Sequence, residues 1–150
     1  HLTRCRVLRV LWNKFNTLVA SEHKPMPLSP SLIFHAVQPD NTLLPRGLIA
    51  FHMILWKFTI FNLVQVDTDN VRFSTDKVWS DTIRRFETRA SALAFKVKRR
   101  TTKRHGQGIE ILEPDAENRM LAPLATVTPW GKLEYSPAMQ KAIDAIHTTS

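Results

Sequence analysis

The sequence predicts a mainly α-helical fold: a small helical domain with a long basic helix and an irregular, Pro-containing tail. Apolar residues recur at three- and four-residue steps over several long segments, which is the spacing of one helical face. They make up 43% of the 150 residues, enough for a core, while only 4 glycines are present. We expect a helical body over residues 1–105 that ends in the basic helix, and an acidic, irregular tail over 106–150.

Two helices are expected in the first forty residues. Over residues 2–20 the apolar side chains fall on one helical face and Arg4, Arg6, Arg9 and Lys14 lie on the other. Further along, Ser29 has the character of an N-cap, and Pro30 suits the first helical position. A short helix through Val37 follows from that pair.

Residues 47–66 are the most apolar stretch, and their length could cross a bilayer. Lys57 lies near the centre, where a charge in lipid is costly. A core helix, buried on most sides, is therefore favoured, and a membrane span is the alternative. The β-branched and aromatic residues of the second half also allow a strand there. Residues 67–73 are expected to form a turn.

The strongest helical pattern runs from Asp76 to about residue 104, with Ser74 or Thr75 as its cap. Its apolar stripe is formed by Trp79, Ile83, Phe86, Ala90, Leu93, Ala94 and Val97. We expect this helix to pack on 47–66, with Leu55, Trp56 and Phe58 as its partners. Each large apolar side chain buried there would contribute on the order of 1.5–3 kcal/mol.

The pattern weakens after residue 108. Residues 109–112 could form a short strand, and 113–135 show no sustained period, so we expect the tail to wrap the body or a partner in extended form. Ser136 and Pro137 then open a final helix to about His147. That helix carries Met139, Ile143 and Ile146 on one face.

Positive charge is concentrated in the long helix. The chain has 21 basic and 13 acidic side chains, of which residues 76–105 hold 10 and 3, and residues 106–150 hold 3 and 6. Lys and Arg spaced along a helix neutralise phosphates and release counterions. The predicted nucleic-acid-binding residues are Arg84, Arg85, Arg89, Lys96, Lys98, Arg99, Arg100, Lys103 and Arg104. No base-reading motif accompanies them, so the RNA or DNA backbone is the expected partner, without strong sequence specificity. Phe95 lies among these cations and could either stack on a base or belong to the core.

Nothing in the sequence indicates a self-contained enzyme. No phosphate-binding glycine loop, Gly-x-Ser-x-Gly or His-Glu-x-x-His motif is present. The carboxylate pairs Asp67/Asp69 and Asp115/Glu117 are typical of solvated turns, and His52 is typical of a core histidine. We therefore expect a non-enzymatic protein with no catalytic residues and no cofactor.

A metal site is not expected from these residues alone. His1 and Cys5 form a His-x-x-x-Cys pair, but Cys5 is the only cysteine and a structural zinc takes four ligands. The pair becomes a candidate only if a longer parent chain supplies the other ligands. A first residue of His1 favours a processed chain or a piece of a longer one.

The order of several motifs resembles the region that follows the polymerase domain in non-LTR retrotransposon reverse transcriptases. The matching features are the opening H-L-T-R-C-R-V-L-R-V-L-W, Leu55-Trp56, Asn70 with Phe73, and Ala92-Leu93-Ala94 in the basic helix. The resemblance spans residues 1–104. It implies a nuclear, zinc-knuckle-like, post-catalytic module that grips template RNA or target DNA.

Two other classes stay open. An accessory subunit of a mitochondrial ribosome or a respiratory membrane complex would also suit the acid-poor N-terminal segment and the Pro-containing tail, with other protein subunits as partners. A membrane-surface protein could place the basic helix on anionic lipid. We rank that class last, because the apolar stripe is also what a core needs.

Overall fold

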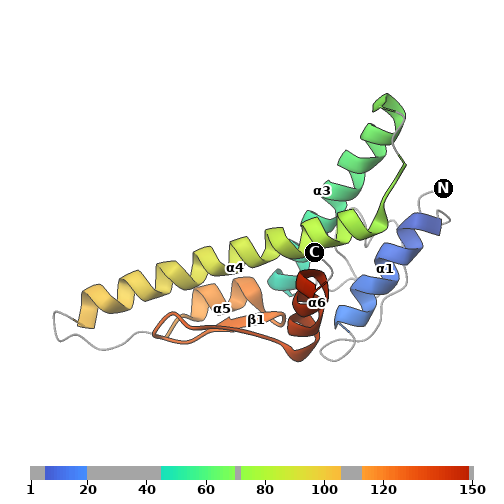
Figure 1. The fold of residues 1–150 in the computed structure, drawn as a ribbon. Helices are drawn as coiled ribbons and strands as arrows, with labels where there is room; N and C mark the ends of the chain where they lie inside the picture. Colours follow the sequence, from blue (N-terminus) through green and yellow to red (C-terminus); the bar gives the residue numbers. More distant parts are fainter. Residues whose placement is uncertain (1–5, 20–44, 70–71, 106–112, 149–150) are drawn as a thin grey trace.

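A computed structural model of the chain describes residues 6–19, 45–69, 72–105 and 113–148. Within these ranges it contains five helices and one two-stranded antiparallel sheet, so the expected mainly α fold is confirmed. Figure 1 shows the long helix α4 running along the molecule, with the other elements arranged around it. The predicted short helix ending at Val37 and the predicted strand at 109–112 lie outside the described residues.

Helix α1 (Arg6–Val19) forms within the predicted range 2–20. Its apolar face is buried as the spacing predicts, through Leu8, Leu11, Trp12, Phe15 and Leu18. The ring of Phe15 lies 5.9 Å from that of Phe51 in α3, which joins α1 to the centre of the core.

Helices α3 (Arg46–Asp69) and α4 (Thr75–His105) pack on each other, as expected. The aromatic contact between them is made by Phe51, whose ring centroid lies 5.5 Å from that of Trp79 and 5.7 Å from that of Phe86. Leu55 is buried as predicted, but Trp56 and Phe58 are only half-buried. The crossing of the two helices therefore lies about one turn nearer to the start of α3 than the sequence suggested.

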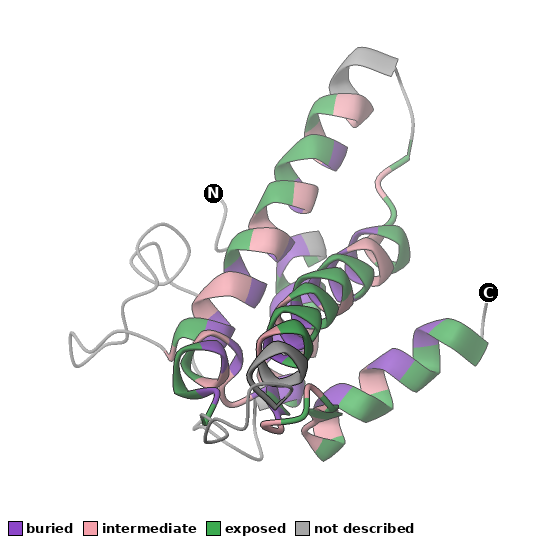
Figure 2. Cartoon of the chain, turned by 90° about the vertical axis from the view of Figure 1, so that its left-hand side faces the viewer, coloured by how far each residue is buried: buried purple, intermediate pink, exposed green. Residues whose placement is uncertain are grey.

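The expectation that 47–66 is buried on most sides is wrong for its second half. Figure 1 shows α3 rising away from α4, and in Figure 2 its upper turns are coloured mainly as exposed or intermediate. Met53, Ile60, Phe61 and Val64 are exposed. The segment is helical through Asp69, so the strand alternative is also wrong, and residues 67–69 are helical where a turn was expected.

Helix α4 begins where predicted. The backbone N–H of Lys77 donates to Ser74 Oγ over 3.2 Å, so Ser74 is the cap. Every residue of the predicted stripe is buried except Leu93, which is half-buried. The stripe is one of the main contributors to the core, because it faces α3 first and the C-terminal elements further along.

Residues 113–148 do not form an extended tail, and that expectation is wrong. They fold into α5 (Asp115–Leu121), the hairpin β1 (Ala125–Val127) and β2 (Leu133–Tyr135), and α6 (Pro137–Thr148). Thr126 pairs with Glu134 in the hairpin. The strands are three residues long, too short to show a period in the sequence, and their inward side chains join the core.

Two side chains stabilise this C-terminal part: one joins α5 to β1, and the other caps α6. The amide of Asn118 in α5 accepts from the Val127 N–H over 2.6 Å and donates to the Val127 carbonyl over 3.3 Å. Ser136 Oγ accepts from the Met139 N–H over 3.2 Å and caps α6, as its sequence predicts. The predicted inward face of α6 is confirmed, since Met139, Ile143 and Ile146 are buried.

Gly47 permits a close approach between the start of α3 and the end of α5. Its N–H donates to the Ala122 carbonyl over 3.0 Å. A Cβ at this position would overlap the carbonyl groups of Leu121 and Ala122. The absence of a side chain therefore lets α5 dock on α3.

Candidate nucleic-acid interface

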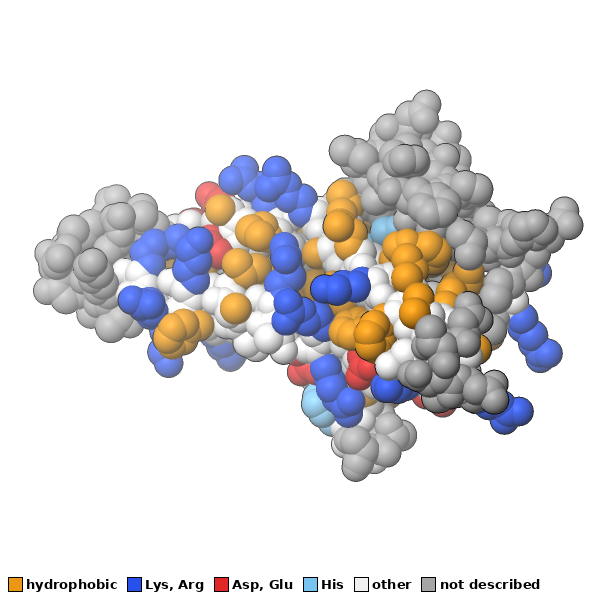
Figure 3. Space-filling view, turned by 90° about the horizontal axis from the view of Figure 1, so that it is seen from above, with side chains coloured by type: hydrophobic (Ala, Val, Ile, Leu, Met, Phe, Trp, Pro, Cys, Tyr) orange, Lys and Arg blue, Asp and Glu red, His pale blue; other side chains and the backbone are white. Residues whose placement is uncertain are grey.

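The buried stripe of α4 determines where its cations lie. Ala94 and Val97 face the core. Lys96, Lys98 and Arg99 are neighbouring positions that point away from the core, and they are exposed. From Arg89 to His105 the sequence contains no acidic residue. Figure 3 shows Lys and Arg side chains gathered over the left-hand part of one face, where α4 runs, with hydrophobic side chains among them.

The predicted nucleic-acid-binding residues lie in different places on α4. Lys96, Arg99 and Arg100 line a shallow hollow of about 380 Å³ together with Phe95. Arg85 and Arg89 line a different depression, between α3 and α4. Arg84 and Lys98 are exposed and line neither of these two hollows. Positions 103 and 104 belong to α4, but the side chains of Lys103 and Arg104 lie outside the described residues.

Arg100 is also part of the fold. Its Nη1 donates to Glu117 Oε1 of α5 over 2.9 Å. Glu117 is 3% exposed, so the expectation that the Asp115/Glu117 pair is solvated is wrong for Glu117, while Asp115 is exposed. Buried carboxylates are normally paired, and here the cation lies 17 residues away in sequence, on another helix. Arg100 therefore ties the basic half of α4 to α5.

Phe95 is not part of the core. Its side chain is 61% exposed and lies among Lys96, Arg99 and Arg100 at the hollow described above. Of the two alternatives in the sequence, burial is excluded. An aromatic side chain is therefore presented to solvent within the densest group of cations.

The hairpin turn meets α4 next to a second exposed aromatic residue. Gly131, with a φ of +83°, lies directly on α4 at Lys98, because a Cβ there would come 2.8 Å from Lys98 Cα. The preceding residue, Trp130, is 54% exposed. The Pro129-Trp130-Gly131 sequence is typical of a turn, but nothing in it shows that the turn rests against the basic helix.

The depression between α3 and α4 is lined by both apolar and basic side chains. Its volume is about 540 Å³. Lys57 of α3 and Arg85 and Arg89 of α4 supply the charge, and Met53, Ile54, Phe58, Leu93 and Met120 supply apolar lining. Lys57 belongs to this basic site although the sequence does not indicate it, because its neighbours in the sequence are apolar and the cations of α4 lie far away along the chain.

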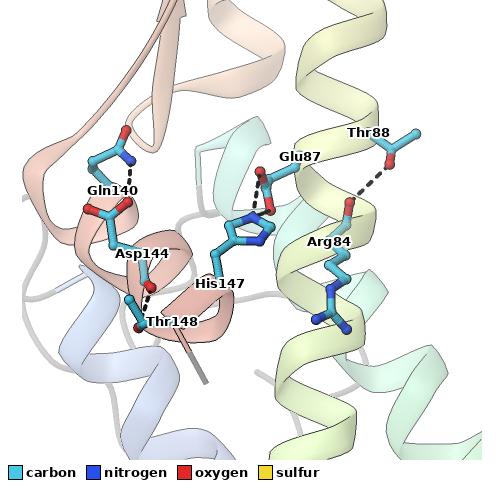
Figure 4. A network of polar contacts seen from close by, with 7 residues as sticks. All are labelled: Arg84, Glu87, Thr88, Gln140, Asp144, His147 and Thr148. Atoms are coloured by element: carbon cyan, nitrogen blue, oxygen red, sulfur yellow. Dashed lines mark hydrogen bonds and ion pairs between the residues drawn. The ribbon is translucent and has the colours of Figure 1, made fainter. Parts of the chain in front are cut away.

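His52 and His147 line neither of the two hollows. His52 is buried, with its ring 5.2 Å from that of Trp12, as expected of a core histidine. His147 Nε2 of α6 lies 3.2 Å from Glu87 Oε1 of α4. Figure 4 shows the two side chains facing each other. Among the described residues no group of three His, Cys, Asp or Glu side chains could hold a metal ion. His1 and Cys5 lie outside them.

Glu87 also affects the tyrosine of the hairpin. Burial, and secondly the negative charge of Glu87, raise the pKa of Tyr135 to about 12. Tyr135 of β2 and His147 of α6 therefore lie near the same carboxylate. Glu87 belongs to the first half of α4, which carries fewer cations than the second half.

The chain was compared with known protein families, with curated proteins and with solved structures, and none of the three comparisons finds a match. Functional assignment therefore depends on the chemistry of this surface.

Proposed function

We propose that this protein is a non-enzymatic nucleic-acid-binding module that holds RNA or DNA phosphates along α4. The observation that carries the proposal is the exposed, acid-free face of α4, on which Lys96 and Arg99 lie beside the half-exposed Arg100. From Arg85 to Arg99 the helix rises about 21 Å, at about 1.5 Å per residue, so it can meet several phosphates. The resemblance to retroelement polymerases suggests that the parent system grips template RNA or target DNA.

The cations have different expected roles. Lys96 and Arg99 are the central phosphate contacts, since both are exposed and both line the hollow. Arg84, Arg85, Arg89 and Lys98 are exposed and add longer-range attraction. Arg100 supplies charge but is held by Glu117, so its removal tests stability and binding together.

The test is a salt series of binding measurements. Fluorescence anisotropy of a labelled RNA hairpin and a matched DNA duplex would be recorded for the wild type and for Lys96→Gln with Arg99→Gln. We expect weaker binding in the double variant and a log–log salt slope that is less steep by about 0.9 for each B-DNA phosphate that the variant no longer neutralises. Lys141→Gln, an exposed cation of α6, is the matched control and should leave both quantities unchanged. An unchanged slope in the double variant contradicts the assignment.

A second candidate, an accessory subunit of a large assembly, is supported by the outer face of α3. Ile60, Phe61 and Val64 are exposed there, and Met53, which is also exposed, lines the depression between α3 and α4. By length and composition α3 could also cross a membrane over Arg46–Val66. The core helix of a soluble protein meets the same criterion, and 39% of the most apolar part of α3 is buried in the fold.

Fractionation separates these alternatives. If α3 lies in a bilayer, the expressed chain should sediment with membranes and need detergent, and Ile60→Gln with Phe61→Gln should release it. A chain that stays in solution without detergent contradicts a membrane position. If it then also binds no nucleic acid at low salt, a protein subunit interface becomes the better interpretation.

A further inference from the structure

We infer that the nucleic acid is single-stranded, with one base stacked on Phe95 while Lys96 and Arg99 hold the neighbouring phosphates. This inference rests on the proposed function and specifies its ligand. It goes beyond phosphate contact, because a stacking site distinguishes an unpaired strand from a duplex.

Phe95 is a large aromatic side chain that the fold leaves exposed. Phenylalanine is a residue that folding normally buries, and α4 has buried positions on both sides of it in the sequence, at Ala94 and Val97. Phe95 instead points away from the core and is 61% exposed. Packing against the described residues therefore does not account for a large aromatic ring at this position.

The surroundings of the ring are basic. Phe95 and Arg99 are four residues apart and lie on the same side of the helix, and Lys96 lies beside them. All three line the same hollow. A ring face flanked by two cations matches a nucleotide, whose base offers a π face and whose phosphate offers negative charge.

The hairpin turn adds a second aromatic side chain. Gly131 rests on the α4 backbone at Lys98, three residues from Phe95, and it brings the half-exposed Trp130 to this part of the helix. Proteins that bind single strands without sequence preference place aromatic rings along a basic surface, so that successive bases stack on them. Trp130 is the candidate second platform.

Base pairing decides which ligand can use such a site. In a duplex each base is paired and stacked between its neighbours, and only unpaired bases can turn outward onto a side chain. A duplex would therefore contact the cations alone. Because every base has a π face, the site should tolerate any sequence.

The test compares two exposed phenylalanines. Anisotropy of labelled oligouridylate and of a matched RNA duplex would be measured for wild type, Phe95→Leu and Phe61→Leu. Leucine keeps an apolar side chain of similar length but has no aromatic face, and Phe61 of α3 is 56% exposed, close to the value for Phe95. Both variants should therefore stay folded, which circular dichroism would check.

We expect Phe95→Leu to weaken binding of oligouridylate about 5- to 150-fold, the range of one base–aromatic stack. Duplex affinity should not change, and the salt slope for the single strand should also stay the same, since every phosphate contact remains. Phe61→Leu should affect neither ligand. Trp130→Leu should weaken single-strand binding by less than Phe95→Leu.

Three results would overturn the inference, and they differ from one another. If Phe95→Leu leaves oligouridylate binding unchanged while Lys96→Gln with Arg99→Gln weakens it, phosphate binding stands and stacking is wrong. If Phe95→Leu weakens both ligands equally, the ring supports the surface and does not select single strands. If the wild type binds neither ligand at low salt, both the inference and the proposed function are wrong.

Discussion

The two long helices, α3 and α4, use apolar residues in opposite ways. Helix α3 is the more apolar, yet its second half exposes Ile60 and Phe61 and buries Thr59 and Asn62. Helix α4 is strongly basic, yet it buries a continuous stripe from Val78 to Val97. The spacing of apolar residues, rather than their number, therefore determines whether a helix is packed along its whole length.

Two of the buried polar residues of α3, Thr59 and Asn62, each donate a hydrogen bond to a backbone carbonyl of the same helix. Thr59 Oγ1 donates to the Leu55 carbonyl over 2.7 Å, and Asn62 Nδ2 donates to the Phe58 carbonyl over 3.2 Å. Such bonds remove most of the cost of burying a hydroxyl or an amide. The inward positions of α3 can therefore be polar while its outward positions stay apolar and available to a partner.

The largest expected difference is between Phe86 of α4 and Phe61 of α3. Phe86→Ala removes a fully buried ring in contact with Phe51 and should lower the free energy of unfolding by about 3–5 kcal/mol. Phe61→Ala removes an exposed ring and should change it by no more than about 0.5 kcal/mol. Urea unfolding followed by circular dichroism measures both. A comparable loss for Phe61→Ala would show that the outer face of α3 is packed in solution, and the contrast between the helices would fail.

The next test concerns how the two helices are anchored, beginning with α3. Gly47→Ala places a methyl group against the Leu121 and Ala122 carbonyls, so α5 must shift. We expect a loss of about 1–3 kcal/mol, as for other overpacked sites, although alanine favours the helix. Arg46→Ala, an exposed neighbouring position, is the control and should cost little. Thermal unfolding of both variants checks this, and a stabilised Gly47→Ala variant would show that α3 and α5 are less closely packed.

The basic half of α4 is anchored by Arg100. Arg100→Gln leaves the buried Glu117 without its cation and should cost about 1–3 kcal/mol, toward the lower end because the Arg100 side chain is 31% exposed. Arg99→Gln, one residue earlier and exposed, should be nearly neutral for stability. Denaturant midpoints compare the two variants. Equal stabilities would mean that the ion pair does not hold α4 to α5.

The smallest effect appears only at high pH and tests the contact between α4 and the hairpin. Because the folded pKa of Tyr135 is about 12 against an ordinary value of 10.0, the folded state holds this proton more tightly than the unfolded state. Its contribution to stability is complete below pH 10 and is lost as the pH rises toward 12. The chain has one tyrosine, so the ultraviolet absorbance of tyrosinate reports Tyr135 alone.

Two variants refine that measurement. Glu87→Gln removes the second cause of the shift and should lower the titration midpoint slightly, because burial, the main cause, remains. Tyr135→Phe should remove this part of the alkaline loss of stability. A wild-type midpoint near 10 would show that β2 does not bury the ring against α4.

Elements whose signals are local can be predicted from the amino-acid sequence alone. The stripe from Trp79 to Val97, the Ser74 cap and the Ser136-Pro137 start of α6 each depend on residues within a few turns of one another, and the structure confirms all three. The sequence also predicts that the cations of α4 are exposed, since the periodicity that buries the stripe leaves the helix positions between stripe residues facing solvent.

Contacts between residues far apart in the sequence follow only from the way the elements pack together. The pairing of Arg100 with Glu117, the contact of Gly131 with Lys98 and the exposure of Phe61 beside the buried Thr59 all depend on how α3, α5 and the hairpin dock on α4. Periodicity describes the faces of one element, whereas docking depends on which faces of several elements fit together in space. The position of Phe95 shows both effects. Its place in the helix follows from the sequence, and its exposure follows from the absence, among the described residues, of an element packed over that side.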